Sequence, residues 1–402
     1  MQDNGLVGFF EQFLTKTSVF TNKAALQAQY APGVIQHRDT QITQVANVLA
    51  PCLKNERPSN LFIYGKTGTG KTLVTRYTTD QIKNVAEQRQ LPVKIVYINC
   101  KLKKVADTEY RLMAQLAKEF GKEVPPTGLP TDEVYRIFFS ALDKHKQTVV
   151  LILDEIDQLV GKAGDELLYN LTRINSELQQ AQISIVGISN DLAFTDALDP
   201  RVKSSLSEEE LVFAPYDALQ LQDILRDRAS IAFRPNAVEA GVIEKCAARA
   251  ASDNGDARRA LELLRVAGEL AERQNMDRIA LAHLDIAEET LEKNRVLEFV
   301  RIQPKQHQAT LYSILNVCAQ KSGVFTGEIY DAYQKVCAQT KLRPLTQRRV
   351  SDIIAEFDMN GLISAKVISK GRYGRTREIR LAVPPQNCAQ MLQLLQEGLA
   401  LA

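Results

Sequence analysis

The segment NLFIYGKTGTGKT, residues 60–72, constrains the fold more than any other part of the sequence. It places a short apolar run before the spacing GxxxxGK[ST], whose backbone N–H groups can converge on a phosphate. Glycine permits positive φ angles and a close approach of backbone to phosphate, and a helix beginning near Lys71 adds the positive end of its dipole. The pattern predicts a polyphosphate loop in which Lys71 reaches the β- and γ-phosphates and Thr72 binds Mg²⁺. The expected loop residues are Gly65, Lys66, Thr67, Gly68, Thr69, Gly70, Lys71 and Thr72.

Four apolar runs alternate with helical patterns between residues 61 and 190: LFIY, VKIVYIN, TVVLILD and ISIVGIS. Such runs are typical of strands buried on both faces, and their alternation with helices predicts a parallel sheet. After Pro215 the strand patterns stop, and Ala- and Leu-rich helical patterns continue to about Glu298. We therefore expect an N-terminal extension (1–30), an α/β nucleotide-binding domain (31–214), a helical second domain (215–298) and a further domain (299–402).

The strand-like run VVLILDEID ends in two carboxylates, Asp154 and Glu155. Both are expected at the carboxyl edge of the sheet, where ligands of α/β proteins bind. Asp154 would hold Mg²⁺ together with Thr72, and Glu155 would polarise the attacking water. Acidic residues can instead cap the next helix. The glycine-rich loop upstream favours the catalytic interpretation.

Three further polar residues fit the same pocket. Asn190 follows the run ISIVGIS and could orient the water, although Asn after a strand also suits a turn. Arg201 and Arg258 could each approach the γ-phosphate, because a guanidinium suits spread phosphate charge. Each of them is alternatively a surface or helix-end arginine.

Composition narrows the class of protein. Hydrophobic content of 45% and charged content of 24% are those of a soluble globular chain. There is no apolar run of 18 residues and no N-terminal signal peptide pattern, so we expect a cytoplasmic protein without a membrane span. The six cysteines include no CxxC spacing, and we expect no structural zinc. Residues 300–402 carry 14 Lys+Arg against 7 Asp+Glu, which suggests a nucleic-acid-binding part.

The basic C-terminal part reads as three short helices followed by a hairpin. In LTQRRVSDIIAEFDM, apolar residues recur at i, i+3, i+4 and i+7, which predicts a buried helix face. Thr346 can cap this helix, whose first turn is where a helix-turn-helix protein meets base edges. The expected base-reading residues are Gln347, Arg348 and Arg349.

The runs SAKVIS and REIRLAV, joined by KGRYGRT, predict the wing of a winged-helix domain. Lys370, Arg372 and Arg375 suit phosphates or a minor groove. Tyr373 either stacks on a sugar or base or stabilises the hairpin. A winged helix can also bind protein, but residues 366–380 carry six basic residues against one acidic, which favours DNA.

The succession IYGKTGTGKT, VVLILDEID, GISN, LDPRVKSSL and GDARRALELL resembles the AAA+ ATPases, and specifically the archaeal replication initiators of the origin-recognition and cell-division-cycle type. The resemblance covers nearly the whole chain, including PLTQRRVSDI and the wing. It implies an α/β P-loop AAA+ core, a helical lid and a C-terminal winged helix, with ATP or ADP and Mg²⁺ as ligands. It also implies Walker A at Gly65–Thr72, Walker B at Asp154 and Glu155, sensor 1 at Asn190 and sensor 2 at Arg258, with the adjacent Arg259 as a competitor.

The resemblance implies two further sets of residues. The segment with Ile35, His37 and Arg38 would line the adenine pocket, and a helix after the second strand would touch DNA. That second segment supplies Lys101, Lys103 and Lys104. Eukaryotic relatives that complete a neighbour's site often carry a second arginine four positions after the equivalent of Arg201, whereas this chain has Ser205. One feature of hydrolysis coupled between subunits is therefore missing.

The leading hypothesis from the sequence is an ATP-dependent replication initiator that binds duplex origin repeats and helps recruit the replicative helicase. Its weak ATPase activity, which converts ATP and water to ADP and phosphate, would act as a switch. The protein would work at the nucleoid, beside a paralogous initiator. Two alternatives stay open. A ring-forming AAA+ motor, such as a Holliday-junction branch-migration ATPase, needs a competent trans arginine and fast turnover. A nucleotide-gated transcription regulator would bind promoters and recruit no helicase.

Overall fold

The computed structural model describes residues 18–101, 108–125, 127–194, 198–206, 208–321, 323–369 and 375–401. The chain divides into two compact units, Met1–Leu284 and Asp285–Ala402. Among the described residues, no helix combines the length and the apolar character needed to cross a membrane.

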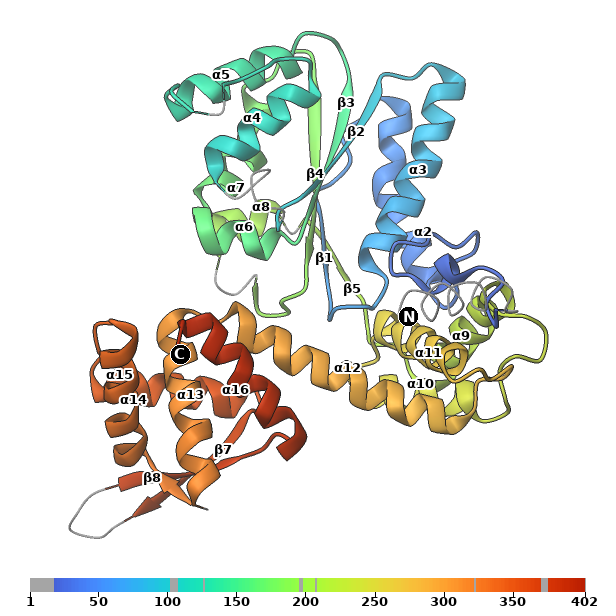
Figure 1. Cartoon of the computed structure of the whole chain (residues 1–402). Helices are drawn as coiled ribbons and strands as arrows, with labels where there is room; N and C mark the ends of the chain where they lie inside the picture. Colours follow the sequence, from blue (N-terminus) through green and yellow to red (C-terminus); the bar gives the residue numbers. More distant parts are fainter. Residues whose placement is uncertain are drawn as a thin grey trace, which may run out of the picture. The chain divides into compact units, whose positions relative to one another are not determined.

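A five-stranded parallel sheet forms the centre of the first unit (Figure 1), with the strand order β2-β3-β4-β1-β5. Its strands are β1 (Leu61–Tyr64), β2 (Val93–Asn99), β3 (Thr148–Asp154), β4 (Gln182–Ser189) and β5 (Glu209–Val212). The interior strand β3, which lies between β2 and β4, is buried along its whole length, which explains its continuous apolar sequence. The predicted parallel sheet is confirmed, and β5 is an addition to it. This short edge strand has only one buried residue, Leu211, and its polar pattern gave no strand signal.

Helices cover both faces of the sheet (Figure 1). On one face lie α2 (Asp39–Leu49) and α3 (Lys71–Arg89), and on the other lie α4 (Glu109–Glu119), α5 (Thr131–Leu142), α6 (Ile156–Ala163), α7 (Glu166–Arg173) and α8 (Pro200–Leu206). The short 3-10 helices η2 (Ala50–Lys54) and η3 (Ile174–Ser176) follow α2 and α7. Each layer has its own apolar core, because the strands bury alternate side chains on opposite faces.

Strand register determines which polar residues meet at the carboxyl edge of the sheet. Asn99 of β2 pairs with Asp154 of β3, and Asp154 pairs with Ile188 of β4. Tyr64, directly before the glycine-rich loop, pairs with Ser189 at the end of β4. The loop after β1 and the ends of β2, β3 and β4 therefore lie at one edge.

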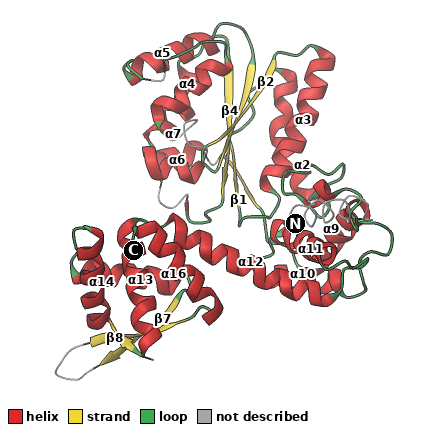
Figure 2. Ribbon diagram, viewed as in Figure 1, coloured by secondary structure: helices red, strands yellow, loops and turns green. Residues whose placement is uncertain are grey.

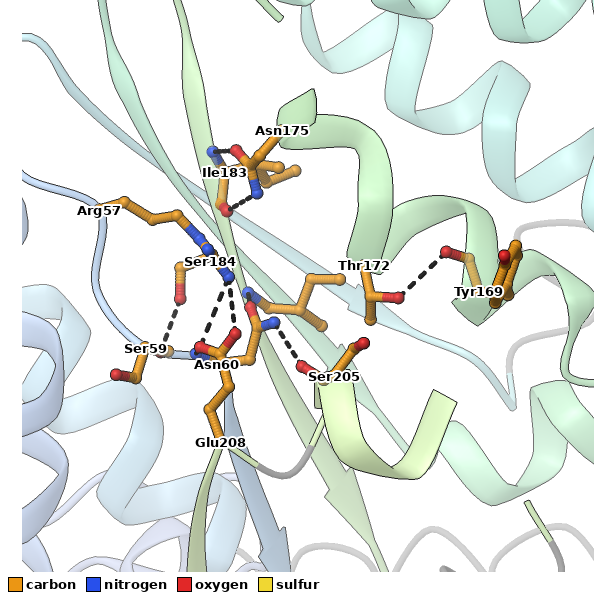
Figure 3. Close-up of polar contacts among 11 residues, drawn as sticks. Arg57, Ser59, Asn60, Tyr169, Thr172, Asn175, Ile183, Ser184, Ser205 and Glu208 are labelled. Carbon is orange, nitrogen blue, oxygen red and sulfur yellow. Dashed lines mark hydrogen bonds and ion pairs between the residues drawn. The ribbon is translucent and has the colours of Figure 1, made fainter. Parts of the chain in front are cut away.

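At the opposite, amino-terminal end of the strands, the buried Asn60 ties three segments together (Figure 3). Its Nδ2 donates to the Ser205 carbonyl at the end of α8 (2.7 Å), and its Oδ1 accepts from the backbone N–H of Ile185 in β4 (2.8 Å). The carboxylate of Glu208 accepts from the backbone N–H of Asn60 (2.7 Å) and from Arg57 (3.0 Å). Buried polar groups need such partners, so this network fixes β1 against β4 and α8.

Three helices form the lid of the first unit: α9 (Ala218–Ala232), α10 (Val242–Ser252) and α11 (Ala257–Arg273). Residues before the core pack on this lid, including the 3-10 helix η1 (Lys23–Leu26). The rings of Phe20 and Phe233 lie 4.9 Å apart, and a Cβ on Gly268 would lie only 2.6 Å from Phe20. The described part of the N-terminal segment is therefore an integral part of the lid layer.

Helix α12 (Leu281–Ile302) crosses the boundary between the two units. The second unit contains the helices α13 (Lys305–Gln320), α14 (Thr326–Thr340), α15 (Gln347–Met359) and α16 (Pro385–Leu399), shown in Figure 2. Its antiparallel sheet has the order β6-β8-β7, formed by β6 (Val324–Phe325), β7 (Ile363–Ser369) and β8 (Arg375–Leu381). Three helices and a hairpin confirm the predicted winged helix, and α16 extends it beyond the predicted elements.

Candidate nucleotide site and nucleic-acid interface

The glycine-rich loop lies between β1 and α3, as its sequence predicts. Gly68 and Gly70 have φ angles of 75° and 94°, which side chains rarely tolerate. A Cβ on Gly68 would also lie 1.7 Å from the Asp256 carboxylate at the start of lid helix α11. The Ala257 N–H donates to the Gly68 carbonyl (3.3 Å). The loop is therefore in direct contact with the lid.

Lys71, the first residue of α3, is buried within this loop. Its ammonium donates to the carbonyls of Gly65 (2.6 Å) and Lys66 (2.8 Å). Burial lowers the pKa of Lys71 to about 8, and the nearby Asp154 carboxylate opposes this effect. The ammonium is thus a desolvated positive charge inside the loop, where an anionic phosphate would find strong electrostatic stabilisation.

Asp154, at the end of β3, is held by three donors. Its Oδ1 accepts the backbone N–H of Glu155 (3.0 Å), and its Oδ2 accepts the hydroxyls of Thr72 (3.0 Å) and Tyr97 (2.5 Å). Desolvation and the contact with Asp154 raise the pKa of Tyr97 to about 12, so this hydroxyl is protonated at neutral pH. The carboxylate of Asp154 is buried and oriented toward the side chain of Thr72.

The pairing of Thr72 with Asp154 fits the coordination habits of Mg²⁺. This ion binds proteins through one or two oxygen side chains and completes its shell with substrate phosphates and water. Within the described ranges, no cluster of three or more His, Cys, Asp or Glu side chains suits a metal ion. A hydroxyl and a carboxylate beside a phosphate-binding loop therefore suit a nucleotide-bound Mg²⁺ and not an all-protein metal cage.

Glu155 has a left-handed backbone conformation, with φ 55° and ψ 45°, directly before α6. Such a conformation is costly for a non-glycine residue and is common at functional sites. Its carboxylate contacts Asn99 Nδ2 (3.5 Å) and the Lys101 ammonium (3.4 Å). Lys101, expected to touch DNA, therefore lies against Glu155, while Lys103 and Lys104 lie outside the described residues.

A cavity of about 570 Å³ brings together residues of the loop, the sheet edge and the lid. Gly68, Gly70, Thr72, Asp154, Glu155, Asn190 and Arg258 all line it. Arg259, the neighbour of Arg258, instead pairs with Asp253 on the lid (2.7 Å). Four segments that are distant in sequence thus form one site.

Arg201 is not among the cavity-lining residues. Its guanidinium pairs with Asp199 through two contacts, Nη2–Oδ2 at 3.0 Å and Nε–Oδ1 at 3.1 Å. This pairing lowers the pKa of Asp199 to about 2 and raises that of Arg201. The side chain is 67% exposed, so Arg201 is paired at the surface and is not part of the cavity of its own chain.

Of the three residues expected around adenine, Ile35 lines the cavity, whereas His37 and Arg38 do not. His37 Nε2 lies 3.0 Å from Asp223 on lid helix α9. The buried Arg38 donates to the carbonyls of Thr69 (2.9 Å) and Ala214 (2.7 Å), and burial lowers its pKa. Arg38 therefore connects the glycine-rich loop to the segment that leads into the lid.

Several cavity residues were not predicted from the sequence. Tyr30 lines the cavity from the N-terminal segment, and the Arg228 guanidinium of α9 lies over its ring (4.5 Å). Residues on one face of α3 also line it: Leu73, Arg76, Tyr77, Asp80 and Gln81. Their spacing of i, i+3, i+4, i+7 and i+8 from Leu73 was a usable signal, because these positions share a helix face that adjoins Thr72.

The second unit presents the predicted base-reading residues on its surface. Gln347, Arg348 and Arg349 are exposed in the first turn of α15, and Thr346 Oγ1 accepts the Arg349 N–H (3.4 Å), as predicted. The opposite face of the helix is fully buried and consists of Val350, Ile353, Ile354 and Phe357. Lys370, Arg372 and Tyr373, and the side chain of Arg375, lie outside the described residues.

Comparison with known proteins agrees with this architecture. Residues 54–193 match the family described as "AAA domain", residues 222–289 match "Cdc6 AAA+ ATPase-type lid domain", and residues 298–390 match "CDC6, C terminal winged helix domain". The ORC1-type DNA replication protein 1 of Methanosarcina mazei is 50% identical over 390 residues, which cover 96% of this chain and 93% of the relative. The ORC1-type DNA replication protein of Pyrococcus abyssi is 50% identical over 383 residues, or 94% and 90% of the two chains.

Among solved structures, the Aeropyrum pernix ORC1 protein in complex with DNA matches with a TM-score of 0.84 and 42% identity, covering 95% of this chain and 98% of that one. The Aeropyrum pernix ORC2 protein, at 19% identity and a TM-score of 0.60, shares the fold. The identity to curated relatives extends over all three matched regions. The chain therefore belongs to the ORC1-type DNA replication proteins, a family of AAA+ ATPases with a Cdc6-type lid and a C-terminal winged helix.

Proposed function

We propose that this chain is an ATP-dependent replication initiator that binds duplex repeats at an origin and helps recruit the replicative helicase. One observation carries the proposal: the glycine-rich loop, the Asp154–Glu155 pair and Arg258 of the lid line a single cavity. This arrangement suits a nucleoside triphosphate whose presence is sensed by the lid. Family membership, and a relative solved with DNA, support the step from nucleotide to DNA.

The loop residues and the lid supply the switch. The loop contacts the lid through Ala257 and Gly68, and the Lys66 ammonium contacts Asn254 near the start of α11. A triphosphate between them would draw Arg258 toward the γ-phosphate, because a guanidinium pairs with phosphate oxygens. The lid would then adopt a different position in the ATP and ADP states, which is a population shift with differential contacts in each state.

Hydrolysis at this site would be slow. Mg²⁺, held by Thr72 and Asp154, would neutralise charge on the phosphates. Glu155 would polarise the attacking water and Asn190 would orient it. The carboxylate of Glu155 contacts Lys101, and Arg201 is paired with Asp199. Arg201 does not line the cavity of its own chain, and Ser205 stands where eukaryotic relatives that complete a neighbour's site often carry a second arginine, so we propose a weak ATPase that serves as a timer.

DNA binding would use exposed side chains of both units. Arg348 and Arg349 would read base edges from α15, and an arginine–guanine pair contributes about 1–3 kcal/mol of discrimination. Lys101 would contact phosphates once it leaves Glu155. We further propose that the protein acts in the cytoplasm at the nucleoid, with a paralogous initiator as a second component of the same origin complex.

The decisive experiment is a selection of genomic fragments. The pure protein is incubated with sheared DNA of its own organism, ATP and about 0.15 M salt, and the retained fragments are sequenced. We expect enrichment of a few loci that share a repeat, lost in Arg348→Ala/Arg349→Ala. The matched control, Lys83→Ala/Arg89→Ala, removes two exposed positive charges from α3 and should keep the enrichment. Uniform retention of all fragments would contradict the proposal.

A further inference from the structure

The hydroxyl of Tyr97 makes a contact with the metal-binding carboxylate that the proposed function does not use. Tyr97 lies in β2, next to β3, and its hydroxyl donates to Asp154 Oδ2 at 2.5 Å. The same oxygen accepts the Thr72 hydroxyl at 3.0 Å. Tyr97 also lines the cavity. Its hydroxyl therefore faces the site and reaches the one carboxylate that the nucleotide-bound metal would use.

The orientation of Asp154 depends on few contacts. One carboxylate oxygen is fixed by the backbone N–H of Glu155 (3.0 Å), which leaves the other oxygen to Thr72 and Tyr97. Thr72 is itself an expected metal ligand, so its hydroxyl would both bind the metal and donate to Asp154. Tyr97 also donates to Oδ2, but it is not expected to bind the metal.

The ring of Tyr97 is also held in place. The guanidinium carbon of Arg76 lies 4.0 Å from the ring centroid, within the range of a cation–π contact. Arg76 stands four residues after Thr72 on α3, so both residues lie on the same helix face. This packing restricts the orientation of the ring and therefore the direction of its hydroxyl. Residues that support a metal ligand need such a fixed orientation.

We propose that Tyr97 is a positioning residue that orients the Asp154 carboxylate for the nucleotide-bound Mg²⁺. The inference rests on the proposed nucleotide-binding function and extends it to a residue outside the conventional motifs of the site. Tyr97 touches neither the metal nor the nucleotide in this role. It acts only through Asp154, in the way that outer partners of metal ligands maintain ligand orientation.

The test is the Mg²⁺ dependence of nucleotide affinity in Tyr97→Phe, measured by the fluorescence of N-methylanthraniloyl-ADP. In EDTA the variant should bind the nucleotide within about twofold of the wild type. The Mg²⁺ concentration that gives half of the affinity gain should rise about 10- to 100-fold, the usual cost of losing an outer partner of a metal ligand. The control Tyr135→Phe removes a comparable hydroxyl–carboxylate bond, Tyr135 to Glu109 at 2.6 Å, away from the cavity, and should leave both values unchanged.

A second variant separates positioning from general packing. In an Asp154→Asn background the charged acceptor is gone, so adding Tyr97→Phe should cause no further change in the Mg²⁺ dependence. An equal loss of affinity in EDTA and in Mg²⁺ would assign Tyr97 a merely structural role and overturn the inference. Unchanged Mg²⁺ dependence in Tyr97→Phe would overturn it as well, with the proposed function intact. Failure of the wild type to bind nucleotide at all would overturn both.

Discussion

The region of the candidate nucleotide cavity and helix α15 both carry basic side chains, but they hold them in opposite ways. In the cavity region, Lys71 and Arg38 are each 4% exposed and donate to backbone carbonyls of neighbouring segments. On α15, Arg348 and Arg349 are exposed on a helix whose other face is buried. The positive charges of the first region are buried and hydrogen-bonded within the fold, whereas those of the second region are exposed to solvent.

Substitutions in the two regions should therefore have different effects. Removing a buried, bonded charge changes the conformation or affinity of a whole site. Removing an exposed charge changes binding to a partner and has little effect on the stability of the free protein. Three substitutions test whether the contrast holds, in order of decreasing effect.

Lys71→Ala should have the largest effect and be confined to the first region. Loss of the buried ammonium should weaken nucleotide binding by about 2–5 kcal/mol. The affinity for DNA, measured without nucleotide, should change little. Isothermal titration with ATP and a DNA-binding assay on the same sample measure both. Lys83→Ala, an exposed lysine on the same helix, is the matched control. Normal ATP affinity in Lys71→Ala would show that the cavity is not the nucleotide site.

Asn60→Ala tests the tertiary network at the amino-terminal end of the sheet. The substitution leaves the Ile185 N–H and the Ser205 carbonyl without the partner they have now. Leaving the buried N–H of Ile185 without a partner should lower the free energy of unfolding by about 1–3 kcal/mol, measured by denaturant titration. Gln347→Ala, at an exposed helix position, should change it by less than about 0.5 kcal/mol. If both substitutions changed the free energy of unfolding equally, the distinction between buried, hydrogen-bonded polar groups and exposed ones would not hold.

Arg349→Ala should have the smallest effect. The free protein should keep its stability, because the exposed Arg349 only approaches Asp352 at 3.8 Å. Because Arg349 is proposed to read a base edge, the difference in binding free energy between the preferred repeat and a scrambled duplex should shrink by about 1 kcal/mol. Fluorescence anisotropy with the two labelled duplexes measures this difference. Arg89→Ala should leave it unchanged, and an unchanged difference in Arg349→Ala would exclude base reading by Arg349.

Much of the fold could be predicted because its signals are local. The strand before the glycine-rich loop, the run ending in Asp154 and the apolar stripe of α15 each appear as a continuous pattern. Strand β5 could not be found in this way, since its four residues include a single buried one and its pairing with β1 is what makes it a strand. Helix α16 was not predicted either, and its packing against α13 is visible only in the structure.

The cavity shows a similar limit for side chains. Ile35, His37 and Arg38 are nearly adjacent in sequence, yet only Ile35 lines the cavity. His37 has a φ angle of 59°, a left-handed turn of the backbone that sends successive side chains to different places. Sequence proximity therefore predicted the right segment but not which of its side chains reach the site.

Local patterns in the amino-acid chain were enough to predict the phosphate loop, the buried strands, the capped helix with its apolar face, and the resemblance to a family. Contacts between distant residues, such as Tyr97 with Asp154, Lys101 with Glu155, and Asp256 with Gly68, are visible only in the folded chain. Periodicity, capping and turn chemistry act over a few residues, whereas these contacts depend on strand order, register and the placement of the lid, which many interactions determine together.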